Sequence, residues 1–202
     1  MPLLSSKVGH SLDPIAFKLY RFLFRGRNIR PNAITLAGFL FALIASACIA
    51  SGRLLLAGIL LLFSGILDVL DGAVARNTNT VSPFGGFFDS VLDRYSDLFV
   101  MLGILLFFLR IHDSFFVMLA GATSVGVAAI PYARARAEAE GISCKNGLME
   151  RPERLILLVL GLCFGVLPIV VVILAVLTHV TVVQRVLFVR GAMKNPGFDK
   201  KS

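Results

Sequence analysis

Long apolar runs constrain this chain more than any other feature. Several stretches of roughly twenty residues are almost free of charge, and a helix that rises about 1.5 Å per residue needs about that many to cross a hydrocarbon core about 30 Å thick. With 57% hydrophobic and 16% charged residues, an ordinary soluble domain is excluded. The net charge of +8 therefore does not indicate a nucleic-acid partner, because a soluble nucleic-acid-binding protein would not contain such runs. The sequence predicts an all-α integral membrane protein.

Six apolar runs predict six transmembrane helices. They lie at residues 33–51, 54–74, 87–109, 114–136, 152–164 and 168–190. The fifth run is short, so one long kinked helix over the last two runs is the alternative, but Gly165 and Pro168 favour a tight turn between them. We expect a membrane domain at residues 31–190, preceded by residues 1–30 and followed by a tail at 191–202.

The distribution of Lys and Arg predicts the orientation. Basic residues cluster before the first run, between the fourth and fifth runs and after the sixth, whereas only Arg53 and Arg110 fall in the connections on the opposite side. Because cytoplasmic loops carry the excess of Lys and Arg, both termini are expected in the cytoplasm of a multi-pass protein of the cell (inner) membrane.

The first thirty residues are basic and amphipathic. Apolar residues including Leu12, Ile15 and Leu19 recur at helical spacing, while Lys18 and Arg21 take the other side. This pattern predicts a cytoplasmic helix at residues 1–30 that lies in the membrane interface, with a plain cytoplasmic lead-in as the alternative. No cleavable signal peptide is expected, because a compact apolar core is missing.

Four acids beside the second and third runs are the most informative residues. Asp68 and Asp71 lie at i and i+3, and Asp89 and Asp93 at i and i+4, so each pair occupies one helix face. The connection at residues 77–83 makes the two helices antiparallel neighbours. Carboxylates near hydrocarbon are retained only with compensation, and a set made of oxygen ligands suits Mg²⁺ or Mn²⁺. The acids therefore predict a divalent metal site.

Small residues and one arginine surround these acids. Gly72, Ala75 and Gly85 leave room for an anionic ligand, and Arg76 adds a guanidinium suited to phosphate. Close helix packing is an equally good interpretation of the small residues alone. It does not explain the acids, since bare ion pairing would need more arginines in these spans than Arg76 and Arg94.

The arrangement resembles the signature of the CDP-alcohol phosphotransferase (CDP-alcohol phosphatidyltransferase) family. In chain order the matching residues are Asp68, Asp71, Gly72, Ala75, Arg76, Gly85, Asp89 and Asp93. The resemblance implies an enzyme with an interfacial N-terminal helix, six transmembrane helices and a homodimeric assembly. In such an enzyme the hydroxyl of an acceptor attacks a phosphorus of a CDP-linked lipid, and CMP leaves.

The resemblance also implies roles for individual residues. Asp68, Asp71 and Asp89 would bind two Mg²⁺ ions, with Mn²⁺ as the alternative metal. Asp93 would contribute to the second ion and act as the general base. The positions that would contact the CDP-lipid are Asn32, Ala33, Ile34, Thr35, Gly72, Arg76 and Ser82.

Three further segments point to the acceptor. Residues 132–138, 150–154 and 183–185 resemble those of phosphatidylinositol phosphate synthases and their archaeal counterparts, which use inositol phosphate. By position, Arg134, Arg154 and Arg185 would bind the acceptor phosphate, although relatives often carry Lys in place of Arg134. Arg136 and Arg151, which have acids nearby in the sequence, are interpreted as topological charges.

The expected reaction is transfer of the phosphatidyl group from CDP-diacylglycerol to a hydroxyl of inositol phosphate, which yields phosphatidylinositol phosphate and CMP. Glycerol 3-phosphate or another alcohol is the alternative acceptor. A small cation transporter is the alternative outside enzymes, but its coupling-ion site would be expected near the midplane and not at the membrane edge. Asp97, one helical turn beyond Asp93, is expected to support the metal site or the fold.

Overall fold

The computed structural model describes residues 30–144 and 147–194. The predicted interfacial helix therefore lies outside the described residues, apart from Arg30, as does the end of the tail after Lys194. The described residues form six α-helices and no strand, as expected for an all-α protein. The helices are α3 (Pro31–Ala50), α4 (Leu54–Asn77), α5 (Pro83–Arg110), α6 (Ser114–Ala139), α7 (Arg151–Cys163) and α8 (Leu167–Lys194).

Local signals set the helix starts and the tight turns. The hydroxyl of Ser82 caps α5 by accepting a hydrogen bond from the amide of Gly85 at 3.0 Å, and Pro83 opens the helix. Asp113 caps α6 in the same way through the amide of Phe116 at 3.2 Å. Gly165 has φ +70°, a left-handed conformation that separates α7 from α8. The predicted turn is confirmed, and a single long helix there is wrong.

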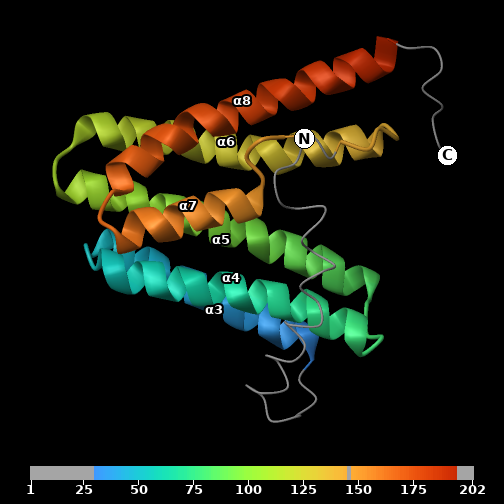
Figure 1. Ribbon diagram of the computed structural model, residues 1–202, viewed down its shortest axis with the longest axis horizontal. Helices are drawn as coiled ribbons and strands as arrows, with labels where there is room; N and C mark the ends of the chain where they lie inside the picture. The colour runs from blue at the N-terminus through green and yellow to red at the C-terminus, as the bar shows by residue number, and fades with distance from the viewer. Residues whose placement is uncertain (1–29, 145–146, 195–202) are drawn as a thin grey trace.

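The helices alternate in direction between the two ends of the bundle (Figure 1). Helix α3 packs on both α4 and α5, α6 packs on α5 and α8, and α7 contacts both α4 and α8. The main core joins Met101 and Phe108 of α5 to Leu162 of α7 and Val171 and Leu174 of α8.

This order gives the bundle two different ends. One end holds the start of α3, the α4–α5 and α6–α7 connections and the end of α8, all on the right in Figure 1. We call it the acidic end, because Asp71 and Asp89 lie near the α4–α5 connection. The opposite end holds the turns at residues 51–53, 111–113 and 164–166.

Length and composition make this a multi-pass membrane protein. Helices α3, α4, α6 and α8 are each long and apolar enough to cross a bilayer. Helix α5 has 28 residues but carries Asp89, Asp93 and Arg94 in its first half and Asp97 just beyond its midpoint. Helix α7 has only 13 residues, equivalent to about 20 Å at 1.5 Å per residue. Large apolar side chains such as Phe115 and Met118 are exposed on the surface, as a lipid environment requires.

Candidate metal and substrate site

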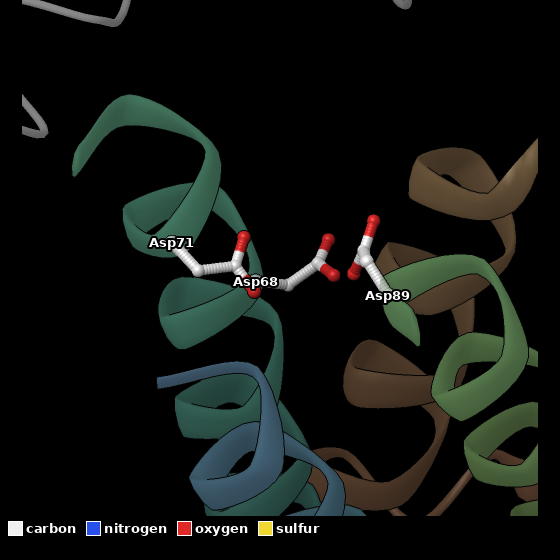
Figure 2. Close-up of side chains that lie close together, drawn as sticks. All are labelled: Asp68, Asp71 and Asp89. Atoms are coloured by element: carbon white, nitrogen blue, oxygen red, sulfur yellow. The ribbon is translucent and has the colours of Figure 1, made fainter. Parts of the chain in front are cut away.

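Three carboxylates from α4 and α5 lie close together at the acidic end. Asp68, Asp71 and Asp89 each offer an oxygen, and these oxygens all lie within 4.8 Å of one another. Figure 2 shows the carboxylates of Asp68 and Asp89 directed toward each other from the two helices. The acids meet as predicted, but the prediction that the second and third runs are packed neighbours is wrong: α4 and α5 each pack on α3 and not against each other.

Burial shows that this cluster suits a cation. Asp71 is only 7% exposed, and its Oδ2 has no hydrogen-bond partner among the described residues. The buried Oδ1 of Asp89 also has no hydrogen-bond partner among the described residues. A buried polar atom without a partner costs about 1–3 kcal/mol, and more when it is charged. A hard divalent cation would satisfy these oxygens, since it prefers an oxygen-only ligand set.

Asp93 lies apart from the close group of three. Its Oδ1 pairs with Nη2 of Arg151 at 2.7 Å, and Nη1 of the same guanidinium pairs with Oδ2 of Asp68 at 2.6 Å. Arg151, at the start of α7, thus connects acids of α4 and α5. The sequence had suggested only a topological role for Arg151, so this contact was missed. The partners that the sequence offers, Glu150 and Glu153, are adjacent along the chain, whereas the observed partners are distant.

A cavity of about 310 Å³ opens beside the acids and contains most of the predicted CDP-lipid contacts. Asn32, Thr35, Gly72, Arg76 and Ser82 line it together with Asp71 and Asp89. Two predicted contacts are not among its lining residues. Ala33 is absent, and Ile34 is 3% exposed and packs in a cluster with Leu70 and Val74. The side chain of Ile34 therefore serves the core.

Polar groups of the cavity occupy the space beside two of the glycines. A Cβ at Gly72 would lie 3.2 Å from Nη1 of Arg76, and one at Gly85 would lie 3.0 Å from Oγ of Ser82 and 3.3 Å from Oδ1 of Asn32. A Cβ at Gly103 would instead meet the backbone oxygen of Ser46 in α3. Gly72 and Gly85 therefore border the cavity, whereas Gly103, which lies outside the group of small residues around the acids, serves helix packing.

A second cavity, of about 680 Å³, is lined by all three predicted acceptor arginines. Arg154 and Arg185 are each 2% exposed. Arg154 donates to Oδ2 of Asp97 at 2.5 Å, and Arg185 donates to the carbonyl oxygen of Ile130 at 2.6 Å. Arg134 is more exposed and donates to Glu138 at 2.8 Å. The arginines are therefore held by fixed partners around one space.

Three further site residues border this arginine-lined cavity. Asp93, Arg94 and Arg151 lie on its wall. Asp93 thus lines the cavity and shares the guanidinium of Arg151 with Asp68 of the carboxylate cluster. Arg136, by contrast, is not among the lining residues and pairs with Glu140 at 2.6 Å, as expected for a charge on a solvated helix face.

The fold and the site together define a class of helical membrane protein that is equipped for metal-assisted chemistry on phosphate groups. A sequence model of the CDP-alcohol phosphatidyltransferase family matches residues 28–192. The chain belongs to this family of membrane phosphotransferases.

Named relatives and solved structures support this membership. The archaetidylinositol phosphate synthase of Methanothermobacter thermautotrophicus is 38% identical over 190 residues, which cover 91% of this chain and 90% of that protein. The phosphatidylinositol phosphate synthase of Mycolicibacterium smegmatis is 33% identical, with coverage of 83% and 82%.

The fold also resembles crystal structures of Mycobacterium tuberculosis phosphatidylinositol phosphate synthase. The structure with CDP-DAG bound has a TM-score of 0.76 and 29% identity, covering 96% of this chain and 97% of that one. The structure in complex with manganese and citrate has a TM-score of 0.77 and 30% identity, with coverage of 92% and 90%.

Proposed function

We propose that this protein transfers the phosphatidyl group of CDP-diacylglycerol, or of a similar CDP-lipid, to a hydroxyl of inositol phosphate. The products are phosphatidylinositol phosphate and CMP. The arginine-lined cavity beside Asp93 carries this proposal. Arg134, Arg154 and Arg185 converge on it, which is more positive charge than a neutral alcohol requires but is suited to a phosphorylated one. The named relatives act as a second line of support.

Binding of the CDP-lipid is assigned to the smaller cavity. Asn32, Thr35 and Ser82 provide polar side chains there, Gly72 provides space, and Arg76 provides a cation for phosphate. Ala33 belongs to the same proposed segment at the start of α3, although it does not line the cavity. This placement puts the diphosphate of the substrate beside Asp71 and Asp89.

The acids hold the metal in this proposal. Asp68, Asp71 and Asp89 bind two Mg²⁺ ions, with Mn²⁺ as the alternative, and Asp93 completes the second site. When bound, these ions neutralise the diphosphate and stabilise the charge that develops on the leaving CMP. The relative crystallised with manganese and the unpartnered carboxylate oxygens of Asp71 and Asp89 support a divalent metal here.

Asp93 acts as the general base. It lines the acceptor cavity, so it is near the hydroxyl that must lose its proton. As Asp93 accepts that proton, the hydroxyl oxygen forms a bond to the phosphorus that carries the lipid. The bond from this phosphorus to CMP breaks, and its electron pair leaves with CMP.

The membrane arrangement proposed for this reaction has six crossings and the acidic end in the cytoplasm. Among the described residues, Arg53 and Arg110 are the only Lys or Arg at the opposite end, which fits the positive-inside rule. The N-terminal interfacial helix, both termini in the cytoplasm of the cell membrane, and a homodimeric assembly complete the proposal. These three features rest on sequence pattern and family resemblance.

The test is CMP release by the purified protein in detergent. CDP-diacylglycerol and its isoprenoid-ether counterpart are each offered with inositol phosphate, free inositol or glycerol 3-phosphate, in the presence of Mg²⁺ or EDTA. We expect CMP only with a divalent ion and inositol phosphate. Equal turnover of free inositol would overturn the acceptor assignment, preference for glycerol 3-phosphate would replace it, and no CMP in any mixture would reject the enzymatic function.

Variants of the active mixture test the arginine cavity. Arg154→Ala and Arg185→Ala each remove a charge-assisted contact, typically about 1.5–3 kcal/mol, so KM for inositol phosphate should rise about tenfold or more. Arg136→Ala is the matched control, because Arg136 pairs with Glu140 outside the cavity, and its KM should stay unchanged.

A further inference from the structure

Arg151 contacts both halves of the proposed metal site. Its Nη1 lies 2.6 Å from Oδ2 of Asp68 in α4, and its Nη2 lies 2.7 Å from Oδ1 of Asp93 in α5. Its side chain is 22% exposed. A guanidinium has five N–H donors in a rigid fork, so it can connect two carboxylates at once. Arg151 therefore neutralises two of the acids that the proposed function assigns to metal binding.

Arg151 also borders the acceptor cavity. It lines the 680 Å³ space together with Arg134, Arg154 and Arg185. One side chain is thus in contact with the acids and close to the place proposed for the acceptor phosphate. The same guanidinium thus makes the ion pairs of both Asp68 and Asp93.

A divalent ion and the guanidinium compete for the same carboxylates. Each carboxylate has a limited set of lone pairs, and two cations a few ångströms apart repel each other strongly away from bulk water. Metal binding by Asp68 and Asp93 must therefore weaken the ion pairs of Arg151. Conversely, Arg151 weakens metal binding as long as it keeps its ion pairs with Asp68 and Asp93.

Asp97 keeps Arg151 close to the cavity. Its Oδ1 lies 4.0 Å from Nε of Arg151, and its Oδ2 accepts a hydrogen bond from Arg154 at 2.5 Å. Arg94 also pairs with Asp97, at 3.5 Å. Asp97 thus gathers three arginines at the cavity wall, so a guanidinium displaced from Asp68 and Asp93 remains beside Arg154.

We propose that Arg151 is a positioning residue that couples metal binding to acceptor binding. In the metal-free protein its guanidinium occupies Asp68 and Asp93, and when divalent ions take these acids it turns its donors to the phosphate of the acceptor. Metal and inositol phosphate then bind with positive cooperativity, and each raises the affinity for the other by the same factor. This inference rests on the proposed function and deepens it.

The test measures Mn²⁺ binding to the full-length protein in detergent, by electron paramagnetic resonance of unbound Mn²⁺, with and without inositol phosphate. For the wild type we expect inositol phosphate to lower the Kd of Mn²⁺ at least about fivefold, the lower end of typical coupling. Arg151→Gln should bind Mn²⁺ more tightly than the wild type in the absence of acceptor, and its Kd should not respond to inositol phosphate. Arg136→Gln is the matched control and should behave like the wild type.

The outcomes separate this inference from the function beneath it. Wild-type binding of Mn²⁺ together with an unchanged Kd and unchanged coupling in Arg151→Gln would overturn the inference alone. A merely structural role predicts weaker Mn²⁺ binding and a lower unfolding temperature in this variant, which would also overturn it. No Mn²⁺ binding by the wild type would reject the metal site itself. If Arg151→Gln does not fold, Arg151→Lys replaces it. Lysine keeps the charge but lacks the forked N–H donors of the guanidinium, so this variant should show reduced coupling.

Discussion

The four acids of the site have two kinds of surroundings, although they follow one another at helical spacing. Asp68, Asp71 and Asp89 gather their oxygens within 4.8 Å. Asp93 lies one helical turn beyond Asp89, pairs with Arg151 and borders the acceptor cavity. This difference in surroundings fits a difference in role: the three bind metal only, whereas Asp93 adds proton transfer to its share in the second metal site.

Replacing Asp93 by Asn tests this division. The variant keeps the size of the side chain but cannot accept a proton, so CMP release should fall by about 10²–10⁴-fold, the usual contribution of general acid–base catalysis. Equilibrium binding of the CDP-lipid should stay close to that of the wild type. Asp71→Asn is the comparison, since it removes a ligand next to the CDP-lipid cavity and should weaken binding as well. Near-normal turnover of Asp93→Asn would remove the general-base assignment.

Sequence spacing predicted the acid cluster because its geometry is local. Each pair of acids shares one helix face, and a short connection joins the two helices, so acids near that connection lie close together. The role of Arg151 could not be predicted in this way, because its partners depend on how α7 packs against α4. Ile34 also could not be placed from spacing alone: it lies within a matching segment, but its side chain packs in the core with Leu70.

At the scale of elements, a close contact with α3 holds α5, the helix that carries Asp89 and Asp93. The hydroxyl of Ser46 in α3 donates a hydrogen bond to the carbonyl oxygen of Phe99 in α5. Gly103, one helical turn further along α5, is buried against the same residue of α3. Small residues of this kind let membrane helices approach closely, so this contact fixes the helix that presents Asp89 and Asp93.

Gly103→Ala tests this contact. The new Cβ would lie 2.5 Å from the backbone oxygen of Ser46, and backbone cannot move aside as a flexible side chain can. The helices must separate, which should cost about 1–3 kcal/mol and lower the midpoint of thermal unfolding in detergent. Gly121→Ala is the matched control: it lies in α6 with open space around it, and Ala favours helix, so stability should be equal or slightly higher. Equal midpoints for Gly103→Ala and the wild type would contradict the argument.

Hydropathy predicted the helices better than their ends. The third apolar run begins at Phe87, whereas α5 begins at Pro83. Hydropathy does not detect this start, because it is set by the capping Ser82 and the proline that opens the helix. Helices α6 and α8 continue to Ala139 and Lys194, beyond the apolar runs that predicted them. An apolar run reports what a membrane could cover, while caps and backbone hydrogen bonds decide where a helix ends.

For the whole molecule, the charge distribution indicates the orientation in the membrane, and helix length and composition indicate which helices cross it. The asymmetry of Lys and Arg agrees with an up-and-down bundle. Among the described residues, Arg53 and Arg110 are the only Lys or Arg at the end opposite the acidic end. Length and composition identify α3, α4, α6 and α8 as candidate spans, whereas α5 contains acids and α7 has only 13 residues. The catalytic proposal requires α5 and α7 to cross as well, because both helices bring site residues to one face of the membrane.

Single cysteines labelled from one side of the membrane test this arrangement. In a variant with Cys48, Cys144 and Cys163 replaced by Ala, a cysteine is introduced at one exposed position at a time. The substitutions at the acidic end are Val81→Cys, Leu148→Cys and Lys194→Cys, and those at the opposite end are Ile111→Cys and Val166→Cys. A membrane-impermeant maleimide should label the second group in right-side-out spheroplasts and the first group only in inverted membrane vesicles.

Each pair of positions tests one helix, so the result does not depend on the others. Val81 and Ile111 flank α5, and Leu148 and Val166 flank α7. Labelling of Leu148→Cys and Val166→Cys from the same side would show that α7 does not cross, and the count of six spans would be wrong. Labelling of all three acidic-end positions in spheroplasts would place the site outside the cell. The charge asymmetry would then need another explanation, because the positive-inside rule predicts the reverse.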